Sequence, residues 1–121
     1  MKKIILMGMT TVALLFLGRI IPAYADADDV KVTGEVIDTF CYATMGAKGE
    51  GHRQCGLDCA KKGIPVAILE NGTDKLYVLI PNKDKTALPD EVINKMGQTA
   101  TITGHVYSKG GDQFLTVESV G

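Results

Sequence analysis

The residues of this chain that could do chemistry lie together between positions 41 and 59. They are Cys41, His52, Cys55 and Cys59, with the spacing Cys-x10-His-x2-Cys-x3-Cys, and the sequence contains no other cysteine. A helix over residues 52–62 would place the last three of them on one face, each about one turn from the next. The glycine-rich stretch that precedes this helix would let Cys41 fold back over that face.

Three thiolates and one imidazole form a tetrahedral ligand set of the kind that binds zinc, and the sulfurs also suit the softer ion Cu(I). The spacing therefore predicts a zinc or copper site at Cys41, His52, Cys55 and Cys59. Four protein ligands leave no open position for a substrate, so a structural or metal-carrying role is favoured over an enzyme. No Ser-His-Asp set, paired-carboxylate pocket or phosphate-binding loop is visible in the sequence.

Asp38 is expected to support this site without binding the metal. It precedes Cys41 by three residues, and its carboxylate could accept a hydrogen bond from His52 or from a loop amide. Such a bond orients a metal-binding imidazole. A solvated or turn-capping aspartate is an equally good interpretation.

Residues 1–25 are predicted to be a secretory signal peptide. Lys2 and Lys3 form a basic start, an apolar run over residues 4–17 follows, and Ala23-Tyr24-Ala25 is a small-x-small cleavage site. The apolar run is shorter than the ~20 residues that span a bilayer, which disfavours a membrane anchor. The mature protein is therefore expected in the periplasm or outside the cell, with no membrane attachment after cleavage.

Export leaves two other uses of the cysteines open. Exported cysteines usually form disulfides, and a bridge from Cys41 to Cys55 or Cys59 would leave one thiol over. A bridge within the helix is geometrically poor, because its Cβ atoms would lie ~6 Å apart instead of ~3.8 Å. A thiol-redox or electron-transfer role is the third interpretation, although Cys-x3-Cys differs from the Cys-x-x-Cys of disulfide oxidoreductases. The odd number of cysteines favours the metal site, which uses all three.

The rest of the sequence predicts a small, mainly β framework. Alternating apolar and polar residues predict strands, and Asn71-Gly72 predicts a hairpin turn. The expected strands cover residues 30–40, 66–69, 76–80, 99–109 and 113–120, with a helix at 88–96. Five strands with a helix between the third and fourth is the order of an OB-type barrel, and a generic five-stranded meander is the alternative.

Residues 26–121 are therefore predicted to be one OB-like domain, with the Cys/His segment at 40–63 inserted between its first two strands. Loss of the signal peptide leaves ten basic and 14 acidic residues, a net charge of −4. Phosphate backbones require clustered lysine and arginine, so no nucleic-acid partner is expected. The expected partners are the metal ion and an exported protein.

The mature chain also contains an ordered pattern: Gly34-x3-Asp38-x2-Cys41, then Cys55-x3-Cys59-x3-Gly63, then a hairpin and Gly97-x6-Gly104. This pattern resembles small exported OB-like proteins of bacteria, most of which have no assigned activity. The resemblance covers nearly the whole mature chain, and Asp-x2-Cys and Cys-x3-Cys are its specific part. It implies an exported OB-like domain with a Cys-rich insertion, and it leaves open what the cysteines hold.

Overall fold

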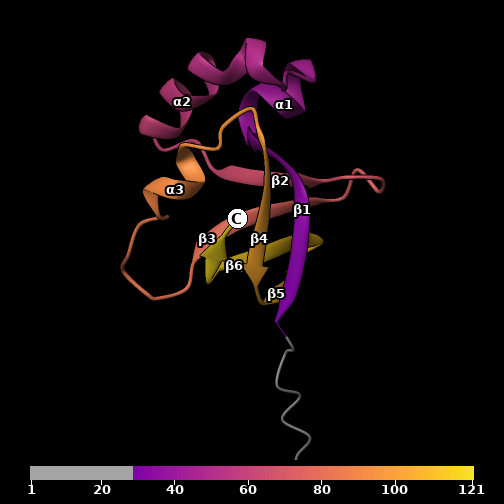
Figure 1. Cartoon of the computed structure of the whole chain (residues 1–121), viewed down its shortest axis with the longest axis vertical. Coiled ribbons are helices and arrows are strands. Elements are labelled where there is room, and N and C mark those ends of the chain that lie inside the picture. The colour runs from indigo at the N-terminus through magenta and orange to yellow at the C-terminus, as the bar shows by residue number, and fades with distance from the viewer. Residues whose placement is uncertain (1–28) are drawn as a thin grey trace, which may run out of the picture.

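The computed structural model describes residues 29–121, and the predicted signal peptide lies outside them. Two helices lie above one end of a mixed β-sheet, and a third lies beside it (Figure 1). The elements are β1 (Val30–Asp38), α1 (Thr39–Met45), the 3-10 turn η1 (Glu50–His52), α2 (Arg53–Lys61), β2 (Val66–Glu70), β3 (Leu76–Pro81), α3 (Asp90–Ile93), β4 (Thr99–Gly104), β5 (Val106–Lys109), β6 (Asp112–Val117) and β7 (Ser119–Val120).

The strands form one sheet in the order β5-β6-β3-β2-β1-β4-β7. β3 and β6 run parallel, and the other neighbouring strands are antiparallel. The predicted mainly β fold is confirmed. The predicted OB-like barrel of five strands is wrong, because residues 29–121 form an open sheet of seven strands.

The strand count differs because each of the last two predicted strands is divided between different neighbours. β4 pairs with β1, whereas β5, which begins after His105, pairs with β6. Likewise β6 pairs with β3, whereas β7, which begins after Glu118, pairs with β4. The backbone N–H of Thr116 donates to the His105 carbonyl at this division. The sheet is therefore bent sharply enough that β4 and β6 contact each other.

β1 organises the sheet, since its first half pairs with β4 and its second half with β2. Gly34 takes part in both pairings, opposite Ala100 and Glu70. A Cβ at Gly34 would lie 2.0 Å from the carbonyl oxygen of Leu69, so only glycine fits where the two partner strands converge. β1 ends at Asp38, two residues before the predicted end, because a helix begins there.

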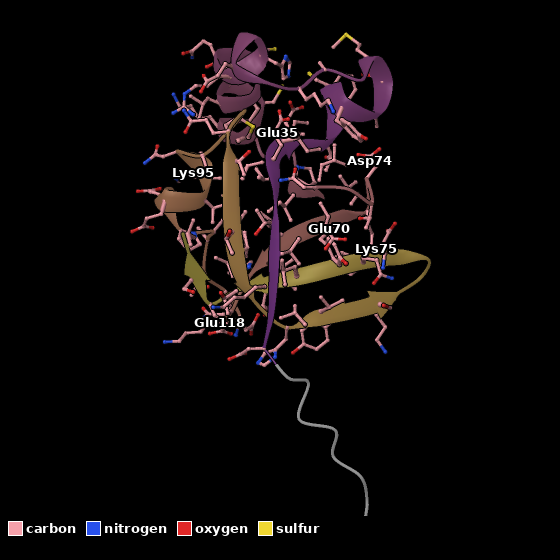
Figure 2. All side chains as sticks on the ribbon, turned by 45° about the vertical axis from the view of Figure 1, so that its right-hand side comes forward. Glu35, Glu70, Asp74, Lys75, Lys95 and Glu118 are labelled. Atoms are coloured by element: carbon pink, nitrogen blue, oxygen red, sulfur yellow. The ribbon has the colours of Figure 1, made fainter. Side chains whose placement is uncertain are left out.

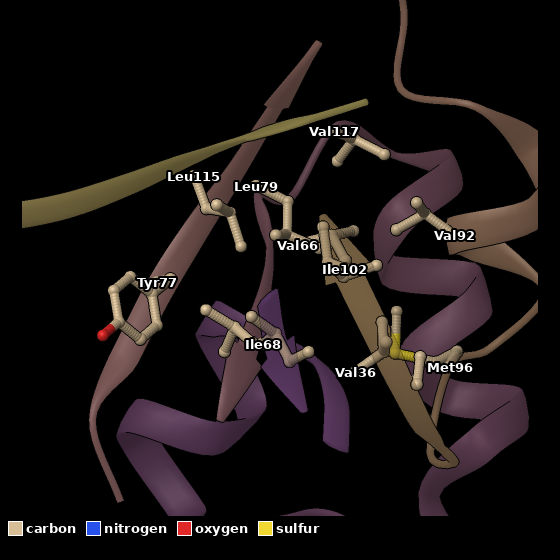
Figure 3. Packing of buried hydrophobic residues seen from close by; sticks show 12 residues of the cluster. Val36, Val66, Ile68, Tyr77, Leu79, Val92, Met96, Ile102, Leu115 and Val117 are labelled. Carbon is tan, nitrogen blue, oxygen red and sulfur yellow. The ribbon is translucent and has the colours of Figure 1, made fainter. Parts of the chain in front are cut away.

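The hydrophobic core lies against the inner face of this sheet (Figure 3). Val36, Ile68 and Ile102 from three neighbouring strands are each fully buried in it. The helix predicted at 88–96 is shorter, since α3 ends at Ile93. Val92 and Met96 nevertheless both pack into the core, and Met96 comes to lie under α2.

Candidate metal centre

Asp38 ends β1 and begins α1, and this transition places Cys41. The Asp38 Oδ1 atom accepts a hydrogen bond of 2.9 Å from the Cys41 backbone N–H, which is the interaction of an N-cap residue. α1 ends at Met45 and is capped by Gly46, whose φ of 64° is the left-handed conformation that glycine adopts readily. Cys41 therefore lies in the first turn of a short helix and is 3% exposed.

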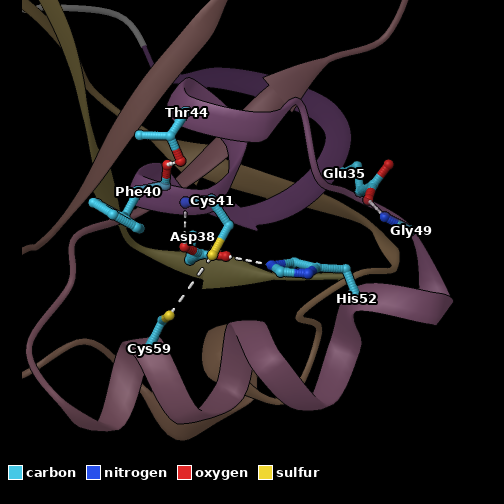
Figure 4. Close-up of polar contacts among 8 residues, drawn as sticks. All are labelled: Glu35, Asp38, Phe40, Cys41, Thr44, Gly49, His52 and Cys59. Carbon is cyan, nitrogen blue, oxygen red and sulfur yellow. Dashed lines mark hydrogen bonds and ion pairs between the residues drawn. The ribbon is translucent and has the colours of Figure 1, made fainter.

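The carboxylate of Asp38 also forms a hydrogen bond with His52. The His52 Nε2 atom lies 2.9 Å from Asp38 Oδ2, and the Asp38 side chain is fully buried (Figure 4). Burial by itself raises the pKa of Asp38, but hydrogen bonds from the Cys41 N–H and from His52 outweigh it and bring the pKa below its ordinary value. An ionised carboxylate only accepts hydrogen bonds, so His52 donates its Nε2 proton to Asp38.

α2 presents Cys55 and Cys59, one turn apart, toward α1. It begins at Arg53, because His52 closes the 3-10 turn before it, one residue later than predicted. Gly56 lies between the two cysteines and is buried against the core. A Cβ at Gly56 would lie 2.7 Å from the Met96 Sδ. The missing side chain therefore lets α2 sit directly on Met96.

The loop before α2 is attached to the end of the sheet. The Gly49 backbone N–H donates to Glu35, and the Arg53 Nη1 donates to the Met96 carbonyl at 2.7 Å. Gly97 has a φ of 74°, and a Cβ there would lie 2.7 Å from the Gly49 carbonyl oxygen. These contacts fix where α2 starts, and hence where its cysteines lie relative to Cys41.

The three cysteine sulfurs converge where α1 faces α2. The Sγ atoms of Cys41 and Cys59 are 3.9 Å apart. Together with the Sγ of Cys55 they form a group whose members all lie within 4.8 Å of one another. Ligand atoms of Asp38, Cys41 and His52 form a second group with the same limit. Cys41 belongs to both groups.

The four predicted ligands are thus divided between these two groups. All three cysteines occur in one of them, whereas His52 is grouped with Asp38 and Cys41. A hydrogen bond joins Asp38 and His52, as their expected proximity predicts, and Asp38 also caps a helix. Asp38 therefore accepts a hydrogen bond from His52 and caps α1 at the same time, because its two carboxylate oxygens have different partners.

The surroundings of Cys41 and Cys59 raise the pKa of these two thiols and keep them protonated. Burial raises the pKa of the Cys41 thiol to about 12, and hydrogen bonding to Asp38 and Cys59 acts in the same direction. Burial also raises the pKa of Cys59, although a hydrogen bond from Cys41 partly offsets it. A metal ion that binds these sulfurs must displace their protons.

Sequence reasoning found the side chains of this cluster but missed what positions them. Gly56, Arg53 and Gly97 carry no ligand atoms, yet each determines how α2 meets the sheet. A glycine within a predicted helix is the signal that could have revealed the close approach at Gly56, because it usually has a packing reason.

Comparison with protein-family models, with curated proteins and with solved structures gives no match for this chain. Among residues 29–121, no helix is both long and apolar enough to cross a membrane.

Proposed function

We propose that this protein is an exported carrier of a soft transition metal, and that it binds Cu(I) in preference to zinc through Cys41, Cys55 and Cys59. The observation that carries this proposal is the convergence of their three sulfurs within 4.8 Å of one another. The signal-peptide pattern of residues 1–25 supports export.

The sulfur positions fit a single ion. With metal–sulfur bonds of ~2.3 Å, sulfurs around one ion lie ~3.8 Å apart in tetrahedral geometry and ~4.0 Å apart in a trigonal plane. The separation of 3.9 Å between the sulfurs of Cys41 and Cys59 lies between these values. The Cys55 sulfur, within 4.8 Å of the others, needs to move by no more than about 1 Å.

The choice of Cu(I) rests on the number of available ligands. Zinc in structural sites is almost always four-coordinate, whereas soft ligands such as thiolates select Cu(I). The Nε2 of His52 is engaged by Asp38, so the Cys3His zinc site that the sequence predicts would need its Nδ1. Cu(I) needs only the three sulfurs. The exposed Cys55 gives an exchanging partner access to the ion.

Anaerobic titration of the reduced protein with Cu(I), against a competing chelator, tests this proposal. We expect one bound equivalent, protection of three thiols from alkylation, and a large loss of affinity on replacing any one cysteine by serine. His52→Ala should reduce Cu(I) affinity only slightly, whereas it would abolish a Cys3His zinc site. His105→Ala, outside both ligand groups, is the matched control. Absence of Cu(I) binding would refute the proposal.

The contact between Cys41 and Cys59 also supports a second candidate, a disulfide-stapled binding module. Their sulfurs, 3.9 Å apart, would have to approach to ~2.05 Å to form the bond. Such a bridge would connect α1 to α2 and leave Cys55 as the free thiol. A thiol count on denatured, unreduced protein from the periplasm separates the two candidates. One thiol supports the bridge, and three support the metal site.

A further inference from the structure

We infer that the face formed by α1 and α2 is a docking surface for a metal-exchanging protein whose own surface is acidic around its metal site. This inference rests on the proposed Cu(I) function, and it adds the chemistry of the partner. It is carried by the distribution of charge over the molecule and by two exposed apolar side chains beside Cys41.

Net charge differs between the cysteine-bearing segment and the other described residues, although the buried carboxylate of Asp38 contacts the segment at His52. Residues 39–65 carry four basic and two acidic side chains, a net charge of +2, whereas the other described residues carry six basic and ten acidic ones, a net charge of −4. Among residues 29–121, no ion pair involves any of the four basic side chains. In Figure 2 Glu70 and Glu118 lie away from the two helices, whereas Glu35 lies next to them, where it accepts a hydrogen bond from the Gly49 N–H.

In the sequence, three lysines lie before and after the pair Cys55 and Cys59. Lys48 precedes the turn that leads into α2, and Lys61 and Lys62 follow Cys59 by two and three residues; all three lysines are exposed. Potentials around a site attract ligands of opposite charge and raise their association rate. A partner with acidic residues around its metal site would therefore be steered toward the exposed Cys55.

Apolar surface is also exposed on α1. Phe40 is 56% exposed and Met45 is 66% exposed, and Phe40 precedes Cys41 directly in the chain. Exposed aromatic and methionine side chains surrounded by polar residues are typical of protein–protein interfaces. Phe40 and Met45 belong to α1 and Lys61 belongs to α2, so a protein partner that covers both helices can bury apolar side chains while its acidic residues meet the lysines.

Transfer on this surface is a ligand exchange without oxidation or reduction. A thiol of the partner loses its proton and binds Cu(I), while the released cysteine thiolate of this chain takes up a proton. Cu(I) keeps its charge, and the number of metal–sulfur bonds is conserved at each exchange. Cys55 is the first sulfur that a partner can replace, because it is the most exposed of the three.

Two synthetic peptides test the inference. Both contain a Cys-x-x-Cys motif and two leucines, and the motif is flanked by four glutamates in one and by four lysines in the other. Stopped-flow measurement of Cu(I) transfer from the loaded protein should be about tenfold faster to the acidic peptide at low salt. The difference should fall below about twofold at 1 M salt, where charges are screened within about 3 Å.

Two triple Lys→Glu variants with the same charge change test whether the lysines of residues 39–65 cause the preference for the acidic peptide. Lys48→Glu, Lys61→Glu and Lys62→Glu together should reverse the peptide preference. Lys31→Glu, Lys83→Glu and Lys109→Glu, the same charge change at exposed positions outside residues 39–65, should leave it in place. Phe40→Ser with Met45→Ser keeps the charge and should slow transfer to both peptides severalfold.

Equal transfer rates to the two peptides at low salt would overturn the inference, as would a preference that the two triple-lysine variants change equally. Cu(I) stoichiometry is measured for every variant before transfer. Failure to load the wild-type protein refutes the proposed function, whereas normal loading with no charge preference refutes only the docking surface.

Discussion

Replacing Gly56 by alanine tests most directly how the fold positions the cysteines. A Cβ at this position would lie 2.7 Å from both the Cγ and the Sδ of Met96. Ordinary carbon contacts lie at ~3.5–4.0 Å, so α2 and Met96 must separate by about 1 Å. Met96 is 1% exposed and packed within the core, so it has little free space to move into.

Two opposing effects determine how much Gly56→Ala changes the free energy of unfolding. Alanine in place of glycine stabilises a helix interior by ~1 kcal/mol, whereas inserting a methyl group into a packed core costs ~1–3 kcal/mol. We therefore expect Gly56→Ala to lower the free energy of unfolding by about 1 kcal/mol. Because α2 carries Cys55 and Cys59, the same displacement should weaken Cu(I) binding by roughly tenfold, equivalent to ~1.4 kcal/mol.

Urea unfolding of the reduced, metal-free protein measures the first effect, and competition with a Cu(I) chelator measures the second. Gly51→Ala is the matched control, because a Cβ there meets nothing within 4 Å and its φ is not in the left-handed region. It should be neutral or stabilising by ~0.4–1 kcal/mol. If Gly56→Ala were also stabilising and left Cu(I) affinity unchanged, α2 would not be seated on Met96 and the reasoning would be refuted.

Three further outcomes are expected. In the metal-free protein at neutral pH, alkylation should modify the exposed Cys55 first, Cys59 next and the buried Cys41 last; mass spectrometry of timed samples checks this order, and denaturant should abolish it. Because the pKa of Asp38 is lower in the folded protein than its ordinary value of 3.8, its contribution to stability is present above that value and is lost as the pH falls through the folded pKa. Urea midpoints of the wild type and of Asp38→Asn should therefore converge as the pH falls below about 4, and a constant difference would contradict this linkage. Asp38→Ala should destabilise the protein at pH 7 by ~1–3 kcal/mol, and by more than Asp38→Asn, because it removes the helix cap and leaves His52 without its acceptor.

The strands were predictable where one local pattern decides the structure. The alternation after Val30, the short apolar run at Val66 and the hairpin at Asn71-Gly72 depend on neighbouring residues, and the structure has a strand or turn at each. The division at His105 was not predictable in this way. It arises because β4 and β5 pair with different strands, and pairing depends on contacts between distant parts of the chain.

In the candidate metal centre, too, features set by neighbouring residues were predictable and features set by other contacts were not. The spacing of Cys55 and Cys59 in a helix is a local property, and it predicted correctly that the two cysteines share a helix. The helix α1 was missed because Thr39 and Phe40 continue the alternation of the preceding strand. Asp38 interrupts that pattern by capping the new helix, so one hydrogen bond to Cys41 decides against the strand propensity of the next two residues.

Asp38 also explains why the two ligand groups share a residue. One carboxylate oxygen fixes the backbone at Cys41, and the other fixes the ring of His52, which ends the turn before α2. The carboxylate can do both only while β1 is paired in the sheet and α2 rests on Met96. The sulfur cluster therefore depends on the folded domain rather than on the Cys/His segment alone. Metal binding to the three sulfurs must accordingly stabilise the whole domain, because only the folded state brings them together.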